Sequence, residues 1–171
     1  RARLIGLDGT AYAAWEQPVT LAPNAIAPGK ALRHTLDGVP EVFLLDLALD
    51  LQGAETVTRR TLFTRQPSLH AALHAAGASP VFAVERGADT WRIDASNPGG
   101  QTALFVWLED ARSPDAPGYA RFDDNYFCLL PGEARTVTVT WDGVPPGERA
   151  VAASGWNFGE QVIQPEQREG Q

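Results

Sequence analysis

The stretch from Phe122 to Glu133, FDDNYFCLLPGE, gathers residue types that often do chemistry: adjacent carboxylates, an amide, a tyrosine and the only cysteine of the chain. Adjacent residues of a strand point to opposite faces, so Asp123 and Asp124 cannot easily form a catalytic pair. The alternating oxygen ligands of a calcium loop are missing too. The pattern favours a structural role, in which short acceptors bind free backbone N–H groups just before a strand.

A turn follows this strand. Pro131-Gly132 fits the two central positions of a type II turn, where proline presets its φ and glycine supplies a positive φ. We expect the turn to join a strand over 125–130 to a neighbouring antiparallel strand over 135–141. Within the first of these strands Cys128 is interpreted as a small buried hydrophobe, and a lone cysteine excludes an internal disulfide.

Other candidate groups are also explained without chemistry. His70 and His74 have a spacing that can bind zinc on a helix, but a third ligand and the glutamate of an HExxH motif are missing. Glu109 and Asp110 end an expected strand and are interpreted as a solubilising or N–H-capping pair. Phosphate-binding and dinucleotide-binding fingerprints are absent from the sequence. We therefore predict no catalytic residue, no cofactor and no metal in this chain.

The five tryptophans raise the question of sugar binding, because sugar C–H faces stack on exposed aromatic rings. Trp91, Trp107 and Trp141 alternate with other residues beside Ile, Phe and Val, so we predict that they are buried in a core. Trp156 lies in SGWNFGE after the last expected strand and is the best candidate for a ring that contacts a sugar or another domain. Tyr119, in the loop SPDAPGYAR, is the next candidate.

Composition excludes some partners. The 171 residues carry a net charge of -7, whereas a nucleic-acid surface needs clustered Lys and Arg. No segment approaches the roughly 20 apolar residues of a membrane span. We predict neither a nucleic-acid nor a membrane partner. The 44% apolar fraction is sufficient for a folded core.

Period-two alternation dominates the chain and predicts strands. The expected strands cover 3–7, 11–15, 41–50, 55–63, 91–96, 104–108, 125–130, 135–141 and 149–154. The strand over 41–50 places Phe43, Leu45, Leu47 and Leu49 on one side, and that over 104–108 is apolar on both faces, as in a central strand covered on both sides. Turn signals such as Asp8-Gly9 separate the strands at the spacing of antiparallel sandwiches. The predicted fold class is all-β, with two immunoglobulin-like antiparallel β-sandwich domains.

One Ala-rich segment, RQPSLHAALHAAGAS, lacks alternation and predicts one or two helical turns between Ser68 and Gly77. We expect a partial immunoglobulin-like sandwich over 1–65, a linker over 66–78, a C-terminal immunoglobulin-like sandwich over 79–160 and a tail over 161–171.

The first group supplies about five strands where such a sandwich needs about seven. The chain also contains no Met and opens directly on a strand. We therefore expect a fragment of a longer protein, with its first domain truncated at the N-terminus. The uncovered sheet edge of that domain would allow self-association.

The stretch GYARFDDNYFCLLPGEARTVTVTW resembles the C-terminal immunoglobulin-like domain of β-mannosidases and their relatives in glycoside hydrolase family 2. A D/N-Tyr-Phe strand, a Leu-Pro-Gly-Glu turn and an alternating Thr/Val strand follow one another there. GQTALFVWLEDAR matches the strand before it, and RARLIGLDGTAYAAW and PEVFLLDLAL are similar to the preceding small sandwich domain. The resemblance covers nearly the whole chain, and exo-β-glucosaminidases share much of the pattern.

In that family the catalytic glutamates lie on a (β/α)₈ barrel ahead of these domains, so no catalytic residue carries over to this sequence. The resemblance implies non-catalytic C-terminal accessory domains of a β-mannosidase-like hydrolase, which would cleave terminal β-D-mannosyl residues. The catalytic barrel of the same parent chain is the implied partner. Alternatives are a parent exo-β-glucosaminidase, an autonomous carbohydrate-binding module, and a structural or adhesive sandwich pair without sugar contact.

Overall fold

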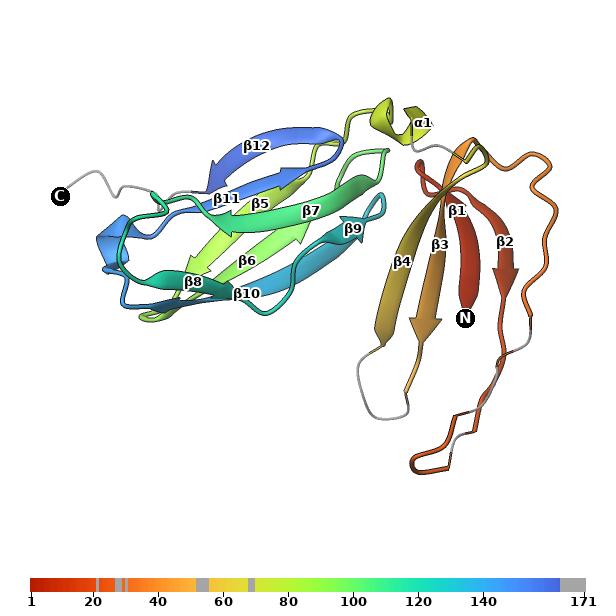
Figure 1. Cartoon of the computed structure of the whole chain (residues 1–171), viewed down its shortest axis with the longest axis horizontal. Coiled ribbons are helices and arrows are strands. Elements are labelled where there is room, and N and C mark those ends of the chain that lie inside the picture. Colours follow the sequence, from red (N-terminus) through yellow and green to blue (C-terminus); the bar gives the residue numbers. More distant parts are fainter. Residues whose placement is uncertain (21, 27–28, 30, 52–55, 68–69, 164–171) are drawn as a thin grey trace. The chain divides into compact units, whose positions relative to one another are not determined.

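The computed structural model describes residues 1–20, 22–26, 29, 31–51, 56–67 and 70–163. The chain divides into two compact units, Arg1–Ala75 and Ala76–Gln171, both built from antiparallel strands (Figure 1). The boundary lies within the segment expected as a linker. A short helix, α1 (His70–Leu73), forms in its Ala-rich part, and the expected N-cap, Ser68, lies outside the described residues. The all-β fold class is confirmed.

The first unit contains one four-stranded antiparallel sheet in the order β2-β1-β3-β4 (Figure 1). Its strands are β1 (Ala2–Gly6), β2 (Ala11–Trp15), β3 (Val42–Leu49) and β4 (Val57–Thr64). About five strands were expected here, and the described residues form four. The expected truncation of this unit and its self-association stay predictions.

The predicted turn between β1 and β2 is present. Gly9 has a φ of 83°, and the Gly6 N–H donates to the Thr10 carbonyl at 2.9 Å. The Asp8 carboxylate accepts the Thr10 N–H and the Thr10 hydroxyl, each at 2.9 Å. These two hydrogen bonds lower the pKa of Asp8, because they favour the charged carboxylate.

A buried carboxylate joins three strands of this sheet. Asp46 on β3 is 2% exposed and lies in register between Arg3 on β1 and Arg60 on β4. Arg3 Nη2 donates to Asp46 Oδ2 at 2.6 Å, and Arg60 Nε donates to Asp46 Oδ1 at 2.8 Å. Paired residues of neighbouring strands lie on the same face, so the three side chains form one ionic row across the sheet.

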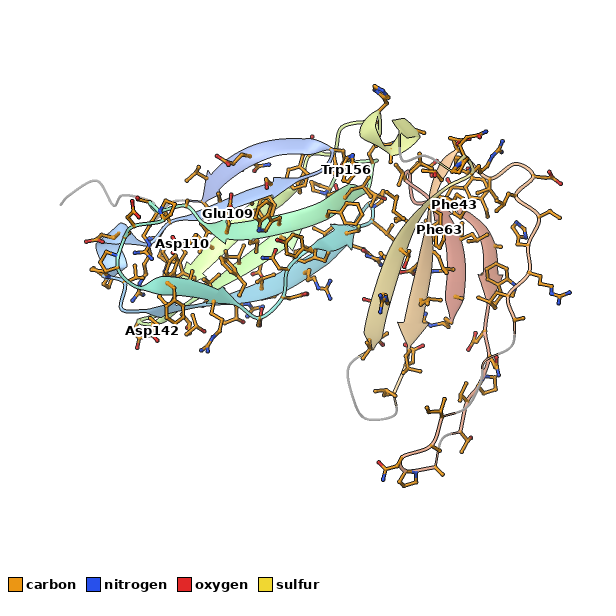
Figure 2. All side chains as sticks on the ribbon, in the orientation of Figure 1. Phe43, Phe63, Glu109, Asp110, Asp142 and Trp156 are labelled. Carbon is orange, nitrogen blue, oxygen red and sulfur yellow. The ribbon has the colours of Figure 1, made fainter. Side chains whose placement is uncertain are left out.

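The opposite face of the same sheet is apolar and opens toward solvent along β3. Phe43 is buried and stacks on Phe63 with ring centroids 5.8 Å apart, whereas Leu47 and Leu49 further along are exposed (Figure 2). Phe43 and Phe63 also line a hollow of about 230 Å³ together with Trp15 and other apolar side chains. Residues on alternate positions therefore share a face as predicted, but only the first part of that face is covered.

The second unit is a sandwich of two four-stranded antiparallel sheets, with strand orders β5-β6-β10-β8 and β12-β11-β7-β9 (Figure 1). Its strands are β5 (Val81–Arg86), β6 (Thr90–Ser96), β7 (Ala103–Asp110), β8 (Tyr119–Phe122), β9 (Phe127–Leu129), β10 (Ala134–Asp142), β11 (Val151–Gly155) and β12 (Phe158–Ile163). Inward-facing residues of both sheets form one core, in which the Trp91 and Trp141 rings meet edge to face at 5.3 Å. The predicted burial of these two tryptophans is confirmed.

Three strands of this unit were not expected from the sequence: β5, β8 and β12, which all lie at sheet edges. Strand β12 continues to Ile163, whose side chain is buried in the core. The last strand thus extends three residues beyond Glu160, into the segment expected as a polar tail.

The expected pairing of 125–130 with 135–141 is wrong. Strand β9 pairs with β7 in one sheet, while β10 pairs with β6 and β8 in the other. The turn itself is present, since Gly132 has a φ of 79° and the Glu133 N–H donates to the Leu130 carbonyl at 3.0 Å. However, the Gly132 N–H donates to the Asn97 carbonyl at 2.8 Å, and the Asn97 N–H donates to the Glu133 carbonyl at 2.9 Å. These bonds bind the turn to the end of β6, so the chain crosses between the sheets here.

Replacement of Trp141 by alanine should reduce the free energy of unfolding of the second unit by about 3–5 kcal/mol, because a buried indole leaves a cavity. Denaturant unfolding measures this loss. Trp107→Ala is the matched control, and its loss should be smaller because that ring is partly exposed. Equal losses for the two variants would contradict the packing described above.

Asp46→Asn should destabilise the first unit by about 3 kcal/mol, since it leaves two arginines around a buried site without their common charge. Hydrogen exchange of the β3 amides measures the effect. Asp50→Asn is the control, because Asp50 pairs with Arg1 where both side chains are about half exposed. A control variant as damaging as Asp46→Asn would refute a special role for the buried carboxylate.

Candidate functional site

The segment between β8 and β9 carries the chain from one sheet of the second unit to the other. The Asp123 N–H donates to the Thr138 carbonyl at 3.1 Å, and Asp123 Oδ1 accepts the Thr138 N–H at 2.8 Å, which binds the segment to β10. Asn125 Oδ1 accepts the Leu108 N–H and Asn125 Nδ2 donates to the Leu108 carbonyl, both at 2.8 Å, which binds it to β7. The predicted binding of backbone N–H groups by the short acceptors of this stretch is confirmed.

The acidic side chains nearby have separate partners. Asp124 Oδ1 accepts the Asn125 N–H at 2.8 Å, and Asp124 Oδ2 forms an ion pair with Arg135 Nε at 2.8 Å. Asp110 forms an ion pair with Arg112 at 2.7 Å and also accepts the Arg112 backbone N–H, which is the predicted N–H-capping role. Asp123 and Asp124 therefore do not form a facing pair.

Cys128 is buried, as predicted, and its Sγ accepts the Phe105 N–H at 3.5 Å. Among the described residues, no group of three or more His, Cys, Asp or Glu side chains is arranged to hold a metal ion. Within the same part of the chain, no helix is long and apolar enough to span a membrane.

The prediction that Trp107 is buried is wrong. Its side chain is 40% exposed and stacks on Tyr126, which is 62% exposed, with ring centroids 5.7 Å apart and an interplanar angle of 24°. Val106 and Leu108 on either side of it are buried in the core. Trp107 therefore points to the outer face of the sheet, and an apolar strand in this position is covered on one side only.

The two predicted site residues lie apart. Trp156, in the hairpin between β11 and β12, is 41% exposed and contacts Phe105 with ring centroids 5.6 Å apart (Figure 2). Tyr119 is exposed on β8 in the other sheet, and its hydroxyl donates to Asp142 Oδ2 at 2.9 Å. Their proposed contacts with sugar or with another domain stay predictions.

Four aromatic residues along β7 thus form the candidate site, which we call the aromatic face: Phe105, Trp107, Tyr126 and Trp156. Phe105 has a φ of 51° and Tyr126 a φ of 58°, a left-handed conformation that is rare for bulky residues. Phe105 lies in an irregularity of β7 between Ala103 and Val106. Strained backbone is retained only where the surrounding structure fixes it, and it is frequent at functional sites. The two left-handed residues therefore make this face a candidate functional site.

Two asparagine side chains fix the ends of the aromatic face. Next to Tyr126, the Asn125 amide holds both backbone groups of Leu108, and Asn125 Oδ1 also accepts the Tyr126 N–H at 3.1 Å. Next to Trp156, Asn157 Oδ1 accepts the Leu104 N–H at 2.9 Å, and the Trp156 N–H donates to the Leu104 carbonyl at the same distance. The rings are therefore held by backbone contacts on both sides.

Sequence reasoning identified only Trp156 of this face. The signal for Trp107 was available, because it alternates with the buried pair Val106 and Leu108. No sequence signal indicated that Phe105 and Tyr126 would adopt positive φ.

The two facing sheets of the second unit, with one shared core, define an immunoglobulin-like β-sandwich. The model of the Ig-fold domain family Ig_mannosidase matches residues 65–152, and the chain belongs to this family.

The comparison with solved structures agrees with this fold. The chain is similar to the exo-chitosanase CsxA of Amycolatopsis orientalis, with a TM-score of 0.63 and 19% identity over 96% of this chain and 23% of that one. A second structure of CsxA, described there as an exo-β-D-glucosaminidase, gives a TM-score of 0.61 and 21% identity over the same shares. Our chain thus spans about a quarter of the length of these proteins. The comparison with curated proteins gives no match. The findings support immunoglobulin-like domains, of which residues 65–152 belong to the Ig_mannosidase family.

The hydrogen bond from Tyr119 to Asp142 raises the pKa of the Tyr119 hydroxyl, because the nearby carboxylate favours the protonated phenol. Asp142→Asn should lower this pKa toward the ordinary value of about 10. The contact stabilises the fold at pH values below that ordinary value, and its contribution is lost as pH rises through the raised pKa. NMR titration of the tyrosine ring carbons measures the shift, with Asp115→Asn as the control. An unchanged Tyr119 pKa in Asp142→Asn would contradict this assignment.

Proposed function

We propose that this chain forms non-catalytic accessory domains of a glycoside hydrolase of the family 2 type, whose catalytic barrel lies in the same parent chain and removes terminal β-D-mannosyl residues. The match of residues 65–152 to Ig_mannosidase carries the proposal. The shares covered in the comparisons, 96% of this chain against 23% of CsxA, agree with a place in a larger enzyme.

The chemistry of the described side chains supports a non-catalytic role. A glycosidase needs two carboxyl groups on either side of a bond, roughly 5–9.5 Å apart and open to substrate. Here Asp46, Asp110 and Asp124 are bound to arginines, and Asp123 is bound to backbone. These carboxylates hold strands and loops in place.

The second candidate activity of the parent is the removal of terminal β-D-glucosaminyl residues. The similarity to CsxA favours it, because that protein is described as an exo-β-D-glucosaminidase. At 19–21% identity the similarity is one of fold, so substrate tests must separate the two sugars.

The 171-residue chain alone should not cleave p-nitrophenyl β-mannoside or p-nitrophenyl β-glucosaminide. The full-length protein encoded by the same reading frame should cleave the β-mannoside at the higher rate, and release of p-nitrophenol measures both. Preferred cleavage of the glucosaminide by the full-length protein would replace the first candidate by the second. Turnover by the isolated chain that persists in Asp123→Asn and Asp124→Asn would disprove the non-catalytic role.

A further inference from the structure

The aromatic face consists of two ring pairs, Trp107 with Tyr126 and Phe105 with Trp156. The Trp107 ring stacks on Tyr126, which directly precedes β9, and on its other side Trp107 pairs with Ser154 of β11. Ser154 is small, so it leaves room beside the indole that a larger side chain would fill. Trp156 and Phe105 continue the aromatic surface along β7.

These rings are held in position by the protein itself. The Asn125 and Asn157 amides fix the backbone beside Tyr126 and Trp156, and the left-handed Phe105 and Tyr126 set where their rings emerge. A ligand would therefore find rings that are already ordered, which reduces the entropic cost of binding. Pre-ordered flat rings suit a ligand with a flat C–H face, such as a pyranose.

The same face carries a negative charge. Glu109 lies two residues after Trp107 on β7 and so points to the same side, opposite the small Ala152. Asp110 and Asp124 nearby are neutralised by Arg112 and Arg135. Among the described residues, Glu109 takes part in no ion pair.

The negative charge of Glu109 favours an amino sugar over a protein partner as the ligand of this face. A protein partner would bury Trp107 and Trp156 in an apolar interface centre, where charged residues such as Glu109 are depleted. An amino sugar instead offers a C–H face to the rings and an ammonium group that both Glu109 and the aromatic faces attract.

We propose that the aromatic face binds an oligosaccharide of protonated amino sugars, with sugar rings on Trp107 and Tyr126 and an ammonium group beside Glu109. Trp156 and Phe105 extend the surface to a further sugar unit. The site does not depend on which sugar the catalytic barrel of the parent removes, so it stands or falls separately from the proposed function.

Titration of the 171-residue chain, followed by amide NMR at about pH 6, where an amine is charged, tests the proposal. The probes are a fully deacetylated chitosan hexasaccharide, the neutral mannohexaose, and hexalysine as a cation without sugar rings. We expect saturable shifts in β7, β9 and the β11–β12 hairpin with the chitosan hexasaccharide, and weaker binding of the other two.

Trp107→Ala should weaken chitosan binding about tenfold, as expected for loss of a stacking ring. Glu109→Gln should weaken it about threefold while leaving the binding of mannohexaose unchanged. Val81→Ala removes an exposed apolar side chain from β5 in the other sheet and should change nothing. Tyr126→Asn is a second test if Trp107→Ala does not fold, because asparagine tolerates a left-handed backbone.

Three results would overturn the proposal. The first is absence of saturation at millimolar chitosan hexasaccharide. The second is binding that survives both Trp107→Ala and Tyr126→Asn and is matched by hexalysine, which would mean general attraction to a protein of net charge -7. The third is a dimer that Trp107→Ala dissociates and that chitosan does not affect, which would assign the face to a second copy of the chain.

Discussion

The second unit depends on the rule that buried backbone N–H and C=O groups must be paired where the chain leaves a sheet. Three asparagine side chains meet this requirement. The fully buried Asn97 donates to the carbonyls of Gln101 and Leu129, and Asn125 pairs both backbone groups of Leu108. Asn157 donates to Ala76 and Thr102 and accepts from Leu104. A primary amide suits this task because it donates and accepts from one planar group.

The first unit is stabilised in a different way, by ion pairs across a single sheet. Its described residues form one sheet, so fewer apolar side chains can be enclosed there than between the two sheets of the second unit. The row of Arg3, Asp46 and Arg60 connects three strands through charge on one face. This row of ion pairs fixes the register of the strands, because a slip by one residue would move Asp46 to the opposite face.

The sequence predicted every interior strand and the edge strands β2, β4 and β9, but it missed the edge strands β5, β8 and β12. Strands such as β6 and β10 are covered on one face, and burial imposes a clean alternation that can be seen in the residues. Edge strands β5, β8 and β12 have fewer buried positions, so composition alone does not distinguish them from loops. Strand β12 was also hidden by the polar residues around Gln161.

Pairing and exposure were harder to predict than strands. A type II turn is compatible with a hairpin and with a crossing between sheets, and contacts with the distant Asn97 decide between them. The exposure of Trp107 likewise depends on whether another segment covers the outer side of β7. The residues next to Trp107 in the sequence do not contain this information. Phe105 and Tyr126, which have positive φ values, donate their backbone N–H groups to Cys128 and Asn125, and contacts of this kind form only in the folded chain.

The reactivity of the buried Cys128 thiol measures local opening of the second unit. Cys128 carries the only thiol of the chain, and its sulfur lies under the backbone of Phe105, between strands β7 and β9. Because the thiol is buried, its alkylation rate reports how often the structure around Cys128 opens locally. Because the same opening would separate Tyr126 from Trp107, one chemical readout on the native protein follows the lifetime of the intact aromatic surface.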